Sequence, residues 1–352
     1  MLLLSKEKIF VVGTPGAEEG TVEILKEREN SKFVSYSDLF DRNNKIASNA
    51  KVYFGFPYEI WDEIVEVKDV LYGCEGYGDA IRTLASMLEE QLFTRFPNAQ
   101  YVNEPSSILV ERDKKLAKDI VKQQGLPVAQ EIPKDVEAIL TSVYSGEPVY
   151  VKARYGSMGK GISYFSEKKW TTNFNYDSKK GTVKNHFNDT DWLEKDITGD
   201  IGFLKRILEH EVVVEKAILN PLVNGMKFDY RVHSIFGLTE PDLSYARVTN
   251  NSSITNISQG GEYVSFEGLK KMVPNQSLDD ALKLISDASI AAGFNFSGGD
   301  VLFSGKDYLP IFLELNSFPG LDASSAADRS VVDKLYKSWG AAVKDERHNY
   351  KS

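Results

Sequence analysis

Short apolar runs alternate with an amphipathic stretch at the start of the chain. Residues 8–13 (KIFVVG) and 51–56 (KVYFGF) have the length and apolar character of buried strands, and residues 69–72 (DVLY) are a further strand candidate. Between the first two runs, residues 22–29 (VEILKERE) predict a helix after a glycine-containing turn. Because strands alternate with helices, the pattern predicts an N-terminal α/β lobe at residues 1–104.

The next stretch is more polar and carries a helical pattern. The segment NEPSS at residues 103–107 has the composition of a boundary between lobes. Residues 111–128 (ERDKKLAKDIVKQQGLPV) place apolar residues at helical spacing, and Gly125 followed by Pro127 ends the helix. We predict that a central lobe occupies residues 105–213.

A strand, a glycine-rich loop and a polar stretch follow within this central lobe. Residues 148–153 (PVYVKA) predict a strand that runs directly into RYGSMGKGISYF. Residues 166–200 are polar and poorly periodic, so they are expected to form a long loop or an insertion.

Alternation of apolar and polar residues, which is typical of half-buried strands, dominates the rest of the chain. Strands are predicted at residues 211–218 (EVVVEKAI), 227–237 (KFDYRVHSIFG), 244–250 (SYARVTN), 300–304 (DVLFS) and 310–315 (PIFLEL). A helix is predicted at residues 277–293, with Ser277 as its N-cap, Asp280 completing a capping box and Gly293 ending it. These elements define a predicted C-terminal lobe at residues 214–352.

Composition narrows the class of protein. A hydrophobic content of 42% and a charged content of 26% are typical of soluble globular proteins, and no stretch is long and apolar enough to span a membrane. The net charge of −9 argues against a general nucleic-acid-binding surface. Cys74 is the single cysteine, which excludes an internal disulfide and a cysteine-based zinc site. We therefore expect a cytoplasmic protein without nucleic-acid or membrane partners.

The two last predicted strands carry oxygen-bearing side chains where burial is costly. If they pair antiparallel about residue 307, Asp300 lies opposite Glu314, and opposed residues point to the same face. Asn316 shares this face because it lies two residues beyond Glu314. The opposite face is suited to a core and carries Val301, Ile311, Leu313 and Leu315.

Oxygen donors on a rigid hairpin suit Mg²⁺, which binds a few carboxylates together with phosphate oxygens. The structural alternative is that Glu314 is a solvated sheet residue and that Asn316 forms the turn.

The glycine-rich loop is the second candidate for chemistry. Glycines let a backbone approach phosphate groups closely, and successive N–H groups can surround an anion. The loop is no Walker loop, because Gly159-Lys160 is followed by Gly161 and not by Ser or Thr. Alone it also fits a plain hairpin, but Lys152 on the incoming strand favours a phosphate clamp.

In this order and spacing, these motifs resemble the ATP-grasp superfamily, most closely ligases of the ribosomal-protein glutamate ligase and glutathione synthetase type. The similarity runs over about residues 104–325. It implies an ATP-grasp fold of class α/β with α+β lobes. A Rossmann-like pre-ATP-grasp lobe would precede two α+β lobes that clamp ATP.

The resemblance also implies the residues that bind ATP. These are Lys114 and Lys152, the lid residues Gly156, Ser157, Gly159, Lys160 and Gly161, and the linker residues Glu215, Lys216, Ala217 and Ile218. Glu215 is expected to face the adenine amino group, and Ala217 and its neighbours to supply backbone hydrogen bonds. The linker reads E-K-A-I where the family more often has Q/E-E-aromatic-I, so adenine stacking is expected to differ.

Further residues are implied for the reaction itself. Arg231 and Arg247 would be the catalytic residues, and Asp300, Glu314 and Asn316 would bind one or two Mg²⁺ ions, for which Mn²⁺ could substitute. The segment SITNISQGG (253–261) resembles the turn near the phosphates. Two roles stay open: Asp229 either orients Arg231 or caps a sheet edge, and His233 either shares the cleft or is structural.

The reaction implied by the resemblance is ATP-dependent ligation of a carboxylate to an amine through an acyl phosphate, with release of ADP and phosphate. Such a reaction needs no side-chain nucleophile, and the sequence contains no G-x-S-x-G elbow. The expected substrates are amino acids, peptides or other small molecules, and a homodimer is common in such families. The alternatives are an ATP-grasp kinase that phosphorylates a hydroxyl group, and a module that binds ATP without turnover.

Overall fold

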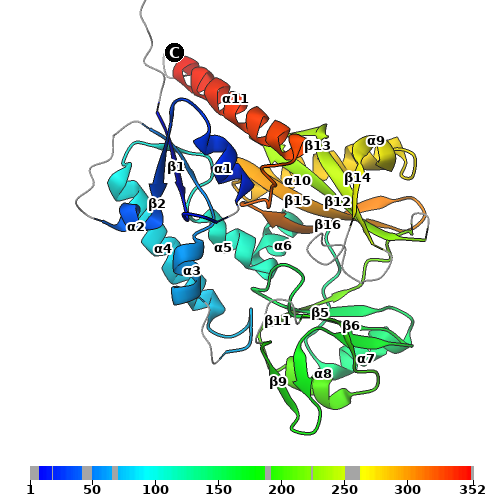
Figure 1. Cartoon of the computed structure of the whole chain (residues 1–352). Coiled ribbons are helices and arrows are strands. Elements are labelled where there is room, and N and C mark those ends of the chain that lie inside the picture. The colour runs from blue at the N-terminus through cyan, green and yellow to red at the C-terminus, as the bar shows by residue number, and fades with distance from the viewer. Residues whose placement is uncertain are drawn as a thin grey trace, which may run out of the picture.

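The computed structural model describes residues 8–17, 19–41, 50–65, 70–186, 192–222, 225–249 and 262–349. Figure 1 shows three lobes: the N-terminal lobe and the C-terminal lobe lie above, and the central lobe lies below them. Each lobe is built on its own sheet, as the predicted ATP-grasp architecture requires. Among the described residues, no helix is long and apolar enough to cross a membrane.

The N-terminal lobe is a parallel sheet with the strand order β2-β1-β3-β4. Its strands are β1 (Ile9–Gly13), β2 (Ser31–Ser35), β3 (Lys51–Phe54) and β4 (Gln100–Tyr101). Its helices are α1 (Gly20–Lys26), α2 (Tyr36–Phe40), α3 (Tyr58–Ile64) and α4 (Tyr77–Arg95). Every residue of β1 is buried, because α2 and α4 cover one face of the sheet while α1 and the C-terminal helix α11 (Ala326–Asn349) cover the other.

The central lobe is an antiparallel sheet with the order β10-β7-β6-β5-β11. Its strands are β5 (Val149–Ala153), β6 (Ile162–Phe165), β7 (Trp170–Thr172), β10 (Lys195–Asp196) and β11 (Val212–Lys216), with a side hairpin of β8 (Asn175–Asp177) and β9 (Thr182–Lys184). The helices α7 (Val136–Tyr144) and α8 (Ile201–Ile207) pack on one face. The helices α5 (Ser107–Arg112) and α6 (Lys114–Gln123) lead into this lobe from β4.

The C-terminal lobe is an antiparallel sheet with the order β14-β13-β12-β15-β16. Its strands are β12 (Lys227–Ile235), β13 (Leu238–Thr249), β14 (Glu262–Ser265), β15 (Phe296–Ser304) and β16 (Leu309–Asn316). The helices α9 (Phe266–Leu269) and α10 (Asn275–Ala291) cover one face, where Phe228, Tyr230 and Val232 of β12 form the core. The alternate residues of β12 point to the other face, which looks toward the central lobe.

Three sequence-based predictions of elements are wrong. Residues 70–72 form a bend and a turn and not a strand, since the run is short and Gly73 follows with a φ of +68°. Of the two alternatives for residues 166–200, the long loop is wrong, because Trp170 and its two threonine neighbours are buried and pair with β6 as strand β7, while the insertion stays a prediction. Helix α10 begins at Asn275 after Pro274, so Ser277 lies inside it and donates to the carbonyl of Asp307 (3.3 Å) and does not cap the helix. The predicted end at Gly293 is confirmed by its φ of +72°.

The predicted hairpin register is confirmed at the pair Asp300–Glu314, and it shifts by one residue between Asp300 and Val301. Asp300 pairs with Glu314 as expected, but Val301 pairs with Phe312, so Leu313 is an extra residue on β16.

This bulge reverses the predicted facing of Ile311, Phe312 and Leu313. Ile311 pairs with Leu302, which lines the cleft, so Ile311 does not share the core face. Phe312 enters the core and Leu313 lines the cleft between the lobes.

Candidate active site

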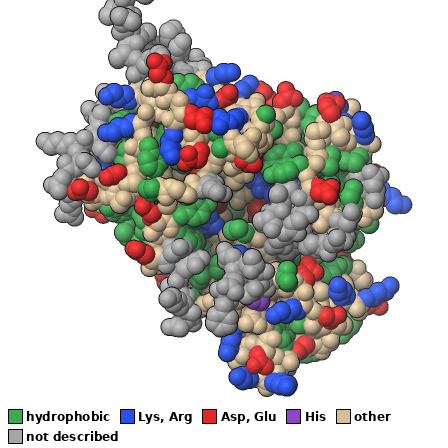
Figure 2. All heavy atoms as spheres, viewed as in Figure 1, with side chains coloured by type: hydrophobic (Ala, Val, Ile, Leu, Met, Phe, Trp, Pro, Cys, Tyr) green, Lys and Arg blue, Asp and Glu red, His purple; other side chains and the backbone are tan. Residues whose placement is uncertain are grey.

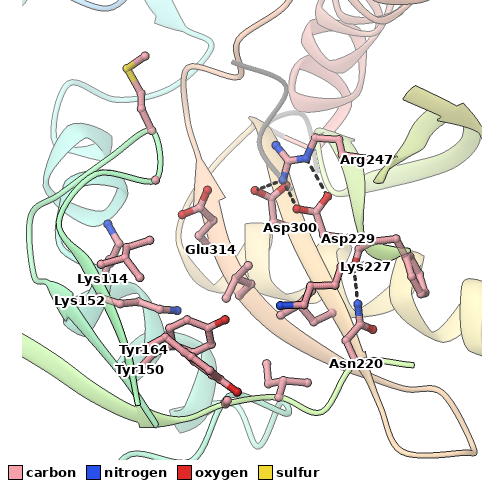
Figure 3. Close-up of a pocket in the computed structure, with 18 of the residues that line it drawn as sticks. Lys114, Tyr150, Lys152, Tyr164, Asn220, Lys227, Asp229, Arg247, Asp300 and Glu314 are labelled. Carbon is pink, nitrogen blue, oxygen red and sulfur yellow. Dashed lines mark hydrogen bonds and ion pairs between the residues drawn. The ribbon is translucent and has the colours of Figure 1, made fainter. Parts of the chain in front are cut away.

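A cavity of about 290 Å³ lies between the exposed faces of the central and C-terminal sheets. Figure 3 shows its two walls: Lys114 and Lys152 come from the central lobe, and Glu314, Asp300, Asp229 and Arg247 come from the C-terminal sheet. The wall of the central lobe is therefore cationic, and the opposite wall carries most of the carboxylates. The predicted lysines and the predicted hairpin are thus brought together in one cavity.

Lys114 owes its position to the cap of helix α6. Asp113 is the N-cap, and its Oδ1 accepts hydrogen bonds from the backbone N–H groups of Lys115 (3.0 Å) and Leu116 (3.1 Å). The same carboxylate binds both ends of the Arg154 guanidinium, at 2.8 and 2.7 Å. Lys114 Nζ then reaches the carbonyl of Gly156, which ties helix α6 to the glycine-rich loop.

Lys118 lies one helical turn after Lys114 and was missed at the level of sequence. Its side chain is 4% exposed and pairs with Glu215, which also pairs with Lys152. The signal was present in the spacing, because residues four apart on a helix point in the same direction. Helix α6 and strand β5 thus place three lysines in the lining of the cavity, Lys114, Lys118 and Lys152, in addition to Lys160 of the glycine-rich loop.

The three lysines have lowered pKa values, with burial as the first cause. Burial lowers the pKa of Lys152 to about 8, with a further contribution from the charge of Lys114. The pKa of Lys114 is also lowered, and that of Lys118 lies well below its usual range, with Lys152 as the second cause. The positive charges of neighbouring lysines repel one another, and a bound polyanion would relieve this repulsion, so the wall suits a polyanionic ligand.

The linker prediction needs a correction at Glu215. Its side chain is 2% exposed and is held by Lys118 and Lys152, so it supports the lysines and does not line the cavity. Lys216 pairs with Glu147 (2.7 Å) and likewise is not part of the cavity wall. Ala217 lines the cavity, but its N–H already donates to the carbonyl of Pro148 (2.7 Å). Ile218, the next lining residue, is the better candidate for a backbone contact to a base.

Two tyrosines complete the wall of the central lobe and were not predicted. Tyr150 and Tyr164 pair across β5 and β6, and their ring centroids lie 5.0 Å apart. Both line the cavity, since they alternate with the core residues of their strands. Together they offer an aromatic surface to a ligand (Figure 3).

The glycine-rich loop closes the cavity at one end, with Ser157, Gly159 and Lys160 in its lining. Gly161 has a φ of +71°, and a Cβ atom there would lie 2.8 Å from Ala153 Cβ, so glycine is required. The N-terminal lobe reaches this loop, because Tyr72 hydrogen-bonds Ser157 Oγ (2.9 Å). The loop, which belongs to the central lobe, is therefore also in contact with the N-terminal lobe.

The opposite wall is a network of arginines and carboxylates set by strand register. Arg231 pairs in register with Asp300, and Arg247 with Asp229, so these side chains share one face. Arg247 donates to both Asp229 oxygens (2.7 and 2.8 Å) and forms an ion pair with Asp300 Oδ2 (2.8 Å). Arg231 Nη2 donates to the same Asp300 oxygen (3.1 Å). Asp229 thus orients Arg247 and not Arg231.

The predicted metal ligands can be tested by their donor chemistry. Asp300 has a pKa of about 2, because Arg231 and Arg247 outweigh its burial, whereas burial and Asp300 raise the pKa of Glu314. Two facing carboxylates of this kind fit a divalent cation, which would offset their mutual repulsion. Asn316 lines a small adjoining cavity with Glu314 and Lys114, and its Nδ2 donates to Gly298 O (3.3 Å).

Across the part of the chain that the structure describes, no three His, Cys, Asp or Glu side chains cluster as a metal site. The predicted donor set of two carboxylates and an amide therefore stays a prediction. The segment SITNISQGG lies outside the described residues.

Comparisons with known proteins agree with this geometry. No curated protein matches the chain in sequence. Among solved structures, the ATP-grasp ligase PsnB in complex with a minimal precursor has a TM-score of 0.55 at 16% identity, covering 94% of this chain and 99% of PsnB. D-alanine–D-alanine ligase from Bacillus anthracis has a TM-score of 0.53 at 16% identity, covering 97% of this chain and 99% of the ligase.

A third similar structure is a RiPP-associated ATP-grasp ligase from Chryseobacterium gregarium, in complex with ADP and a leader and core peptide. It has a TM-score of 0.54 at 15% identity, covering 94% of this chain and 97% of that ligase. At these identities the structures establish the fold. The YheC/D like ATP-grasp family matches residues 108–292, more than half of the chain, and the protein therefore belongs to this family.

Proposed function

We propose that the protein is an ATP-dependent ligase that joins a carboxylate to an amine and releases ADP and phosphate. The observation that carries the proposal is the cavity in which three lysines, buried or half-buried, face the Asp300–Arg231–Arg247 network. Lysines suit the ATP phosphates, while arginines held by a carboxylate suit the charge that develops on a phosphoryl group and on an acyl phosphate. The similar structures with peptides and with D-alanine–D-alanine ligase support an amino acid or peptide as a substrate.

Each part of the cavity has a role in this reaction. Lys114 and Lys152 bind the phosphates, and Tyr150, Tyr164 and Ile218 contact the adenine. Ser157, Gly159 and Lys160 cover the phosphates, since closure of this loop excludes water from a hydrolysable intermediate. Asp300, Glu314 and Asn316 would hold one or two Mg²⁺ ions, or Mn²⁺, which supply charge neutralisation to the phosphates.

The proposal also covers the division into lobes, the location of the protein and its partners. We divide the chain into lobes at residues 1–104, 105–213 and 214–352. We place the protein in the cytoplasm, as a homodimer without nucleic-acid or membrane partners. Figure 2 shows basic and acidic side chains interspersed over the visible face, which supports the absence of a nucleic-acid surface there.

The test is the release of ADP and phosphate from Mg-ATP in the presence of pools of amino acids and peptides. A ligase releases both products in equal amounts and only when a carboxylate and an amine are present, and added hydroxylamine should trap the acyl phosphate as a hydroxamate. Glu314→Gln should abolish turnover, whereas the exposed Glu137→Gln, a matched change on helix α7, should not. A kinase would release ADP without free phosphate, and a binding module would release neither product.

A further inference from the structure

A second cavity opens on the same face of the C-terminal sheet, beyond the arginines. It has a volume of about 620 Å³ and lies between β13, β14 and the start of helix α11. Figure 1 shows this end of α11 beside β13. We call it the acidic cavity, because the acidic residues in its lining are Asp242, Glu267, Asp322 and Asp328, whereas its described lining contains no lysine or arginine.

Strand register places the acidic cavity directly next to the reaction centre. Tyr245 pairs with Arg231 and Tyr263 pairs with Arg247, so both tyrosines share the face of the arginines. The tyrosines line the acidic cavity, and Arg247 lines the 290 Å³ cavity of the candidate active site, which we call the nucleotide cavity. The two arginines and Asp300 therefore form the partition between a nucleotide side and an acidic side.

Asp328 is the buried acid of this cavity. It is 6% exposed, and its Oδ2 accepts a hydrogen bond from the N–H of Asp322 (2.8 Å). Within the described chain it has no ion pair, and burial raises its pKa, while the more distant charge of Arg231 lowers it. A buried carboxylate that no cation contacts directly is costly, and a ligand that supplies a positive charge there would offset this cost.

His233 is an independent sign of a ligand. It lines the acidic cavity, is 1% exposed, and contacts the carbonyl of Leu243 through Nδ1 (2.8 Å). A carbonyl can only accept, so Nδ1 carries the proton. Burial lowers the pKa of His233 to about 4, which leaves Nε2 as a bare acceptor, and it has no hydrogen-bond partner in the described part of the chain.

We infer that the acidic cavity binds the amine substrate, and that this substrate is an alkyl diamine whose far ammonium group pairs with Asp328. This inference rests on the proposed ligase function. A monoamine would be held by the acids as an unreactive ammonium ion, whereas a diamine places one charged end there and presents the other end to the reaction centre. His233 Nε2 accepts a hydrogen bond from the reacting nitrogen and positions it beside Arg231.

The proposed step joins the reacting nitrogen to the acyl phosphate. The reacting end arrives as an ammonium group, so it first loses one proton to solvent, which frees the lone pair. The lone pair of the reacting nitrogen forms the C–N bond to the acyl carbon. The C–O bond to phosphate breaks, and its electron pair leaves with the phosphate. After the C–N bond forms, the nitrogen loses a second proton, which passes through the hydrogen bond to His233 Nε2 and on to solvent.

The test compares 1,5-diaminopentane with pentylamine, a matched monoamine, by binding titration against the full chain with a non-hydrolysable ATP analogue present. We expect the diamine to bind at least about tenfold more tightly, as removal of one member of a buried charge pair affects affinity by that much or more. Asp328→Asn keeps the acceptor for the Asp322 N–H and should erase the preference. Asp279→Asn, an exposed acid on helix α10, should keep it.

Equal binding of the two amines by the unmodified protein would overturn the inference without any variant. A preference that survives Asp328→Asn would overturn it as well. Binding of the ATP analogue is recorded in the same experiment, and release of ADP and phosphate from Mg-ATP is measured beside it, so failure of the ligase proposal is seen separately. If the analogue binds and neither amine does, the diamine inference fails while the ligase proposal stands.

Discussion

Two cavities share one face of the C-terminal sheet, and their charges are opposite. The nucleotide cavity gathers Lys114, Lys118 and Lys152 on one wall, and the acidic cavity has four carboxylates and no described cation in its lining. The partition between them consists of Arg231, Arg247 and Asp300. A reaction that first binds a polyanion and then an amine needs such a division, because each charge type would repel the other's ligand.

The largest expected effect is at the partition. Asp300→Asn removes the carboxylate that binds Arg231 and Arg247 and leaves two nearly buried guanidinium groups with one carboxylate, Asp229. We expect a loss of about 3–5 kcal/mol in the free energy of unfolding, as for other broken buried ion pairs, and loss of turnover. Urea unfolding measures the first, and ADP release measures the second.

The control for this variant is Asp307→Asn in the exposed turn between β15 and β16, which should change the free energy of unfolding by less than about 0.5 kcal/mol. If Asp300→Asn behaved like this control, the network would not be a structural partition. If the folded variant lost ATP binding but kept its affinity for 1,5-diaminopentane, the two cavities would be independent, and the network would not link them as a shared partition.

The next effect is confined to the nucleotide side. Lys152→Met removes one charged donor from the cationic wall, while Glu215 keeps Lys118 as its partner. We expect ATP to bind about 10- to 100-fold more weakly, since a hydrogen bond to a charged group contributes about 1.5–3 kcal/mol. A titration with fluorescent ATP measures this affinity, with the exposed Lys122→Met on helix α6 as the control. Weakened diamine binding in Lys152→Met would contradict a division by charge.

Proton uptake on ATP binding tests the cationic wall of the central lobe in the unmodified protein. Lys152 has a pKa of about 8 in the free protein, and the ATP phosphates should raise it by favouring the charged form. Below about pH 7 this lysine is already protonated and takes up no proton; near pH 8 it should take up about half a proton per ATP bound. Calorimetry in two buffers with different ionisation enthalpies gives this number. Uptake that persists in Lys152→Met would assign it to another group.

The parts of the molecule that could be predicted from sequence are those fixed by local pattern. Strand alternation and turn spacing placed Asp300 opposite Glu314, and the glycines and Lys152 marked the loop. Leu313 was misplaced because a bulge adds one residue to β16 while the apolar pattern stays plausible in either facing.

Contacts between distant segments carry no such local signal. Glu215 looked like a cavity residue, yet its direction is decided by Lys118 and Lys152 from two other elements. The acidic cavity is the clearer example. Asp328 and His233 lie far apart in the chain, and only the packing of helix α11 against β12 and β13 brings them to one cavity.

The smallest expected effect separates the rim of the acidic cavity from its buried acid. Glu267 lies on helix α9, its side chain is 75% exposed, and it already pairs with Lys270 (2.9 Å). Glu267→Gln should therefore change the affinity for 1,5-diaminopentane by no more than about twofold, because exposed ion pairs contribute about 0–1 kcal/mol and are screened by salt. The same titration at low and high salt measures this: the small effect should vanish at high salt, while the effect of Asp328→Asn should persist. If the two variants weakened binding equally, and both effects faded with salt, the diamine would be attracted by the rim as a whole. The buried position of Asp328 would then not be what distinguishes this cavity from its cationic neighbour.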